Sequence, residues 1–318
     1  MRIVRLAFLA VAVGLSVYAL GTRWHEVSQH LHQIGWARLA LCAPGMLGGL
    51  FCGILAWRSI LRGLGSPLPV RPSARVYFVG QLGKYVPGSV WTVLAQMELG
   101  RDHNVPRRRS AAALMIAIMV SLATGLIVAA LTIPFLDGGR HPALWWLVAP
   151  VPVLAALLSP RVLWGCLRRL PVLKLRSSLP PVMSNRSMAS AVAWATMGWV
   201  SYGLHVGVLA TAFHGRGADT VLVASVGGYA LAWAVGLIAF ILPAGAGARD
   251  VTLVLALSGV LATNPAIAVA VVSRAVSTVC DLILAAVAAG AGARLLRRAT
   301  DQSARDAADD GMVRSAAD

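Results

Sequence analysis

Five charged side chains lie within or directly beside apolar stretches of the chain, at Lys84, Arg249, Asp250, Arg274 and Asp281. A charge inside hydrocarbon costs about 2.5–3.5 kcal/mol on insertion scales, so such groups face a partner or water and tend to serve a function. Three cations against two acids predict a cavity with a net positive charge. Such a cavity suits a phosphodiester, because arginine offers a planar pair of donors and lysine a point charge.

Each of these groups also has a purely structural interpretation. Arg274 and Asp281 lie seven residues apart, so they share a helix face and could pair with each other through hydroxyls between them. Arg249 and Asp250 could form a turn at the membrane interface, and Lys84 could extend its ammonium to the membrane surface. The functional interpretation is favoured because two of the groups adjoin separate segments with proline and glycine.

The composition predicts an integral membrane protein. The 318 residues are 58% hydrophobic and 13% charged, which leaves too little polar surface to cover a soluble globule. The net charge is +16, but the bases stand between apolar runs and are not interleaved with aromatic residues as in a nucleic-acid-binding surface. Membrane phospholipid is therefore the expected partner, and nucleic acid is not.

The chain carries no recognisable catalytic motif. Its serines lack the G-x-S-x-G context, and Gly83-Lys84 departs from a phosphate-binding loop because Tyr85 stands where a serine or threonine is required. The four cysteines form no CxxC pair. We therefore expect no catalytic residues, no metal site and no cofactor.

Runs of about 20 apolar residues identify helices long enough to cross a bilayer. The stretch Val221–Leu242 is long enough to span but could also dip into the membrane and return, and Val251–Ala262 has half the needed length. We expect an all-α, polytopic membrane bundle of six to eight transmembrane helices over residues 1–298, followed by a disordered cytoplasmic tail over residues 299–318. The clear runs are Ile3–Leu20, Leu39–Trp57, Ala111–Phe135, Ala143–Leu158, Ala189–Phe213 and Ala266–Gly290. The first could also be a signal peptide, but we interpret it as an uncleaved span because the topology closes better with it.

The basic residues predict the orientation. Of the 28 lysines and arginines, 21 lie in alternate connecting segments, whereas the remaining connecting segments hold only four. Cytoplasmic segments of membrane proteins carry the excess of positive charge. Both termini are therefore expected in the cytoplasm, with the protein in the cytoplasmic membrane of a bacterium.

Two interrupted apolar segments predict a binding site. The stretch Arg75–Leu99 has predicted cytoplasmic charge on both sides, so we interpret it as two re-entrant half-helices broken at Pro87-Gly88. Unpaired backbone at that depth must be buried in protein or line a wet cavity. A second break begins at Pro243 and, like the first, precedes a further proline and a long span. This recurrence predicts an inverted repeat of the kind found in secondary transporters.

Two motifs carry a family resemblance: Gly-Lys-Tyr-Val-Pro-Gly-Ser-Val-Trp at 83–91 and Pro-Ala-Gly-Ala-Gly-Ala-Arg-Asp at 243–250. With them the chain resembles the lysylphosphatidylglycerol synthase transmembrane family, which includes the flippase region of the bacterial multiple peptide resistance factor. The resemblance covers roughly Val4 to Arg298. It implies a domain with re-entrant helices that moves aminoacylated phosphatidylglycerol, or in stand-alone relatives another lipid, between leaflets.

The resemblance also implies substrate-binding roles for residues of both motifs. The second motif departs from the usual family pattern, which is richer in glycine and ends in Arg-Glu. Together with the charges of the last span, the predicted substrate-binding set is Lys84, Tyr85, Pro87, Gly88, Ser89, Trp91, Pro243, Gly245, Gly247, Arg249, Asp250, Arg274 and Asp281.

These features predict a lipid flippase or transporter that moves an anionic or aminoacylated phospholipid, or a lipid-linked precursor, between membrane leaflets. Nothing similar to the family's soluble synthase domain follows Arg298, so we expect a transporter and not an enzyme. One alternative is a membrane-embedded transferase that uses Asp250 or Asp281 as a base on a lipid-linked substrate. Another is a non-catalytic subunit that docks a cytoplasmic lipid-modifying enzyme, and a homo-oligomer also stays open.

Overall fold

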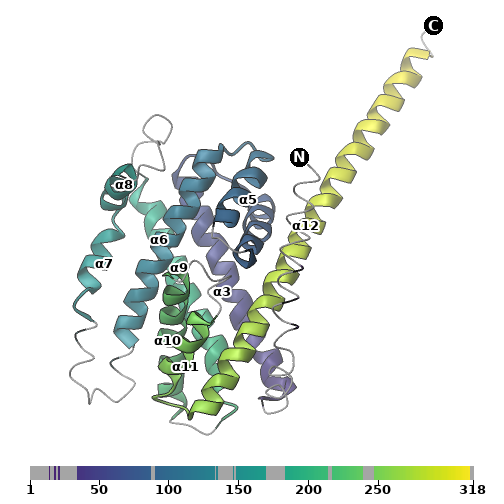
Figure 1. Ribbon diagram of the computed structural model, residues 1–318. Helices are drawn as coiled ribbons and strands as arrows, with labels where there is room; N and C mark the ends of the chain where they lie inside the picture. Colours follow the sequence, from purple (N-terminus) through teal and green to yellow (C-terminus); the bar gives the residue numbers. More distant parts are fainter. Residues whose placement is uncertain are drawn as a thin grey trace.

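The computed structural model describes residues 34–86, 90–132, 148–169, 183–213, 217–238 and 247–315, with the isolated residues 14, 18, 21, 134 and 146. Every regular element within these ranges is a helix, which confirms the all-α prediction. Figure 1 shows long helices standing side by side as a bundle, with shorter helices among them. The predicted first span, Ile3–Leu20, lies outside the described residues apart from single positions.

Four of the described helices are long and apolar enough to cross a membrane. They correspond to four predicted stretches, including Val221–Leu242. A fifth predicted span, Ala189–Phe213, forms α9 (Asn185–Ala210), which is long enough but less apolar because it carries tryptophan, serine, tyrosine and histidine. The four are α3 (Trp36–Gly63), α6 (Arg107–Thr132), α10 (Ala218–Ile238) and the part of α12 over Thr263–Gly290.

The predicted span Ala143–Leu158 is interrupted in its described part. Residues 149 and 150 form a turn, and α7 (Val151–Leu157) has only seven residues, which is too short to cross a bilayer. Pro150 precedes α7 and Pro152 lies in its first turn. A proline ring is compatible with the start of a helix but not with its interior, so the helix begins here instead of passing through. The chain continues into α8 (Pro160–Arg169).

The helices α3 and α9 pack along each other at the centre of the bundle. Their close approach needs small residues: a Cβ atom on Gly45 would lie 2.9 Å from the backbone nitrogen of His205. The buried His205 ring also joins three helices. Its Nδ1 lies 3.1 Å from the Cys42 carbonyl oxygen of α3, and its Nε2 lies 3.1 Å from the Ser273 hydroxyl of α12.

The first predicted break is visible in the elements around it. Val86 has an extended backbone, as expected for a residue that precedes proline, and a new helix begins at Val90. The residues Pro87, Gly88 and Ser89 themselves lie outside the described ranges. The elements are α4 (Val70–Ala74), the π-helical η1 (Arg75–Val79), the 3-10 helix η2 (Leu82–Tyr85) and α5 (Val90–Arg101).

The two arms of this segment lie against each other. The backbone of Gly83 in η2 approaches the backbone of Thr92 in α5 so closely that a Cβ atom on Gly83 would lie 2.5 Å from the Thr92 nitrogen. The packing between the arms therefore requires glycine at position 83. At its far end α5 is joined to the start of α6, where the Arg107 guanidinium lies 2.5 Å from a carboxylate oxygen of Glu98.

The second interrupted segment pairs α10 with the ten-residue α11 (Ala248–Leu257). The helix α11 begins after Gly247, whose φ of 84° lies in the left-handed region that glycine adopts readily. The Gly247 amide donates to the Asp250 carboxylate at 3.1 Å, which caps the first turn. Residues 239–246, which include Pro243 and Gly245, lie outside the described ranges.

The last helix, α12 (Thr263–Ser315), is longer than the sequence predicted. Disorder was expected over residues 299–318, whereas the helix continues to Ser315 and extends beyond the rest of the bundle (Figure 1). No proline follows Pro265, and alanine and arginine are abundant in this part of the chain. Both residue types have a high helix propensity, so local sequence supports the helix even where no apolar face demands it.

Replacing Gly83 by alanine tests the close contact between η2 and α5. The added methyl group would meet the Thr92 backbone, and overpacking of this kind costs about 1–3 kcal/mol. We expect Gly83→Ala to lower the thermal unfolding midpoint of the detergent-purified protein by several degrees. Gly290→Ala is the matched control, because a Cβ atom there has no neighbour within 4 Å. Equal midpoints for the two variants would contradict the packing described.

Candidate functional site

A cavity of about 250 Å³ lies among the interrupted segments and the long helices. Its lining includes Leu50 of α3, Ser121 of α6 and Trp199 of α9, each close to the middle of its helix. A helix long enough to cross a bilayer has its middle near the bilayer centre. The cavity therefore lies at the depth where an unpaired charge is most costly.

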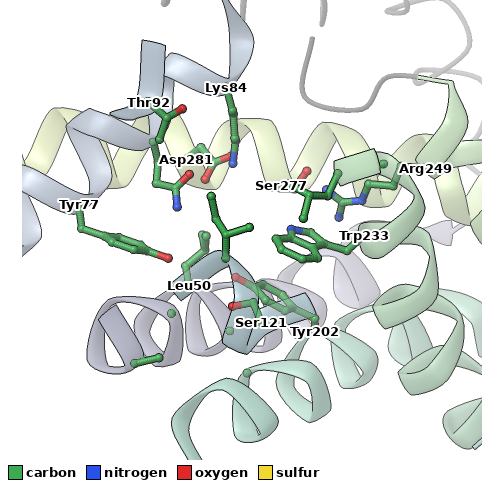
Figure 2. Close-up of a pocket in the computed structure, with 18 of the residues that line it drawn as sticks. Leu50, Tyr77, Lys84, Thr92, Ser121, Tyr202, Trp233, Arg249, Ser277 and Asp281 are labelled. Atoms are coloured by element: carbon green, nitrogen blue, oxygen red, sulfur yellow. The ribbon is translucent and has the colours of Figure 1, made fainter. Parts of the chain in front are cut away.

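The acid in the cavity wall is Asp281 of α12, which is 5% exposed. Lys84 Nζ lies 2.6 Å from Asp281 Oδ2, and the Tyr85 hydroxyl donates to the same oxygen at 2.8 Å. Figure 2 shows the Lys84 and Asp281 side chains directed toward each other. Both partners of Asp281 come from η2, so this contact joins the first interrupted segment to the last span.

A second cation enters from the other interrupted segment. Arg249 stands in the first turn of α11, and its guanidinium carbon lies 4.6 Å from the centroid of the Tyr229 ring. The Tyr202 ring stacks on Tyr229 at 5.0 Å, which places an aromatic pair beneath the guanidinium. Figure 2 shows Arg249 beside Trp233 and Ser277, on a different wall from Lys84.

The third cation in the lining is Arg274, on α12 with Asp281. The hydroxyls of Ser277 and Thr278 donate to the Arg274 backbone carbonyl at 2.8 and 3.0 Å. These two hydroxyls therefore donate to the backbone of their own helix. The cation that pairs with Asp281, Lys84, lies on a different element, η2. With three cations and one acid in its wall, the cavity has the positive balance that the sequence predicted.

The sequence analysis missed an aromatic wall of the cavity. Trp199 and Tyr202 lie three residues apart on α9, and the Trp199 ring meets Trp233 of α10 edge-on at 5.2 Å. The Trp199 indole nitrogen donates to the Thr124 hydroxyl at 3.0 Å, which fixes that ring. The spacing of three residues between Trp199 and Tyr202, which places them on one helix face, was the sequence signal that could have identified this wall. The other polar or aromatic lining residues that were missed are Tyr77, Gln81, Thr92, Ser121 and Ser277.

The structure brings five of the predicted site residues to the cavity and leaves three described ones outside its lining. Asp250 caps α11, Gly247 supplies the turn before it, and Trp91 is 43% exposed. Five predicted residues, Pro87, Gly88, Ser89, Pro243 and Gly245, lie outside the described ranges. The five in the lining are Lys84, Tyr85, Arg249, Arg274 and Asp281.

Within the described ranges, no group of three or more His, Cys, Asp or Glu side chains is placed to hold a metal ion. The wall of the cavity offers three cations, the Asp281 carboxylate, hydroxyls and aromatic rings. These groups can bind an anion and cover the organic part of a ligand.

The family model for the lysylphosphatidylglycerol synthase TM region matches residues 2–285. The chain belongs to this family. None of the curated proteins matches the chain. Membership makes this a membrane protein related to lipid modification or transport, and in this member of the lysylphosphatidylglycerol synthase TM family the matched region contains all three cavity cations.

Removing the Lys84 ammonium tests the contact with Asp281. In Lys84→Met the buried carboxylate keeps the Tyr85 hydroxyl but loses its cation, whereas Lys84→Arg retains a positive charge. We expect the methionine variant to lose roughly 1–3 kcal/mol of stability, less than for a fully buried pair because Lys84 is 33% exposed. Thermal unfolding in detergent measures this loss. The exposed Arg38→Met is the control, and an equal shift in both variants would contradict a specific pair.

Proposed function

We propose that this protein is a lipid flippase or transporter that moves an anionic or aminoacylated phospholipid, or a lipid-linked precursor, between the leaflets of a bacterial cytoplasmic membrane. The observation that carries the proposal is one cavity at the middle of the bundle that holds Lys84, Arg249 and Arg274. The phosphate of a crossing lipid must pass this depth, where hydrocarbon offers it no hydrogen bonds. Three cations around one cavity supply that stabilisation.

The interrupted segments support transport. The arm formed by α4, η1 and η2 ends beside the cavity with Lys84, and α11 starts beside it with Arg249. We infer that both segments are re-entrant and enter from opposite faces, as two halves of an inverted repeat. In support, the ends of α9 and α11 gather in one apolar cluster with Ile34, whereas α5 meets the start of α6 at the other end. Interrupted helices in corresponding halves are typical of transporter binding sites.

The ends of the bundle support an orientation. The Arg109 guanidinium donates to the Gly65 carbonyl oxygen at 3.0 Å, so two of the arginine-rich connecting segments meet at one end. We propose that this end faces the cytoplasm and that both termini lie there, because basic residues are retained on that side. The opposite end, near Gly259, then faces outward.

Transport is favoured over transfer chemistry by the pairing in the cavity. Asp281 is 5% exposed and its Oδ2 accepts from both Lys84 and Tyr85, which favours a role as a fixed counter-anion over a role as a general base. The other proposed base, Asp250, caps α11 and does not line the cavity. A transporter uses the cavity cations without changing a covalent bond in the lipid.

Reconstitution into vesicles tests the proposal. We expect the wild-type chain to equilibrate fluorescent phosphatidylglycerol between leaflets, as measured by quenching from outside. Lys84→Ala and Arg249→Ala should each slow the exchange by roughly tenfold or more, since each removes a charged contact to phosphate. Arg38→Ala, an exposed arginine outside the cavity, should match the wild type. Equal rates in all four proteins and in protein-free vesicles would refute transport. A new lipid species in the mass spectrum would support the transferase instead.

Labelling of single cysteines tests the orientation. The four native cysteines are first replaced, and one cysteine is introduced at Pro67 or at Gly259, both of which are exposed. We expect a membrane-impermeant maleimide to label Gly259→Cys in intact cells and Pro67→Cys only after permeabilisation. Labelling of both from the same side would contradict the proposed crossing of the bundle.

A further inference from the structure

We propose that Asp281 is an exchangeable counter-anion for Lys84. Asp281 pairs with the Lys84 ammonium when no ligand is bound, and the phosphate of the ligand takes its place beside the ammonium. Asp281 then acts as a positioning residue through Lys84 and has no contact of its own with the ligand. The inference rests on the proposed function, because it assumes that the ligand of this cavity carries a phosphate.

The ion pair is built so that one partner can leave and the other cannot. Asp281 is 5% exposed on the long helix α12, whereas Lys84 is 33% exposed and has a long, flexible side chain on the short helix η2. Lysine is a point charge without the paired geometry of arginine, so it can change its anionic partner with little loss of orientation. The mobile member of the pair is therefore the cation, and it lines the cavity.

The Tyr85 hydroxyl stabilises the Asp281 carboxylate during the exchange. Its hydroxyl donates to Asp281 Oδ2 at 2.8 Å, the same oxygen that Lys84 contacts at 2.6 Å. If Lys84 turns to a phosphate, the carboxylate still has a hydrogen bond from a residue that is itself buried. Without the Tyr85 hydroxyl, the departure of Lys84 would leave the buried Asp281 carboxylate without a partner, which is strongly destabilising.

The exchange would also change the contact between η2 and α12. Besides the polar contact to Asp281, η2 meets α12 through a small apolar cluster in which Leu82, Tyr85 and Ala285 are buried. Transfer of Lys84 from Asp281 to a phosphate would remove the ion pair from this interface. A ligand shifts a conformational equilibrium only by its different affinity for the two states, and this exchange supplies such a difference.

Two variants of the same contact should change affinity in opposite directions. Asp281→Asn removes the competing anion and should bind phosphate more tightly, by roughly fivefold or more. Tyr85→Phe keeps the ion pair but removes the donor that stabilises Asp281 after exchange, so it should bind more weakly than the wild type. A purely structural contact predicts that both changes weaken the site together.

The experiment titrates dihexanoyl phosphatidylglycerol into the full chain in a neutral detergent and follows tryptophan fluorescence, since Trp199 and Trp233 line the cavity. Inorganic phosphate is titrated in a parallel series to separate a lipid headgroup from a free anion. Thermal unfolding verifies that each variant is folded, and Asp281→Ser replaces the asparagine variant if the latter does not fold. Lys84→Met combined with Asp281→Asn should show no tightening relative to Lys84→Met alone.

Tighter binding of phosphatidylglycerol by folded Asp281→Asn, abolished in the double variant, would support the exchange. Equal or weaker binding by that variant would overturn it, as would tightening for inorganic phosphate with none for the lipid. Unchanged affinity in Tyr85→Phe would overturn the part assigned to Tyr85. If the wild type equilibrates lipid in vesicles while Asp281→Asn binds no more tightly, only the exchange fails. If the wild type moves no lipid, the proposed function fails whatever the titration shows.

Discussion

A charge in the middle of a membrane protein must have a partner, and the ion pair between Lys84 and Asp281 satisfies that requirement here. Lys84 belongs to a short 3-10 helix that ends beside an interrupted stretch, and Asp281 belongs to the last span. Each group supplies the opposite charge that faces the other in the cavity wall. Their contact therefore decides where the first interrupted segment meets α12, and with it the position of one wall of the cavity.

Close packing between other helices of the bundle surrounds this contact. Small residues allow α3 and α9 to approach closely, and the backbone of η2 can pass α5 only because residue 83 is glycine. On the opposite wall, Arg249 lies over the Tyr229 ring at the start of α11. The result is a cavity with cations from both interrupted segments and aromatic side chains between them. This arrangement gathers polar, charged and aromatic groups in the middle of the bundle, which is the feature on which the proposed function rests.

Much of this architecture follows from residue types that can be recognised along the chain. Apolar runs of sufficient length predicted α3, α6, α10 and the membrane part of α12, because hydrocarbon thickness sets the length of a span. Proline and glycine predicted where the helices stop, and the cost of buried charge predicted that Lys84, Arg249, Arg274 and Asp281 would line a cavity. Each of these inferences needs only local sequence and the properties of the bilayer.

The partners within the site could not be predicted in the same way. Lys84 and Asp281 are 197 positions apart, so only the three-dimensional packing brings them together, whereas the local spacing suggested Arg274 as the partner of Asp281. Asp250 looked equivalent to Asp281 in sequence but caps its own helix, a competing role for an acid in a first turn. Trp199 and Tyr202 were overlooked because aromatic residues at helical spacing usually belong to a core. The helix beyond residue 299 formed where composition alone suggested disorder.

The most direct test of the account is an experimentally determined structure of the protein in a nanodisc that contains phosphatidylglycerol. The account predicts density for a lipid phosphate in the central cavity, within hydrogen-bond distance of Lys84 and of Arg249 or Arg274. Density for the headgroup only at the outer surface of the bundle, with Lys84 and Arg249 directed into separate aqueous phases, would contradict it.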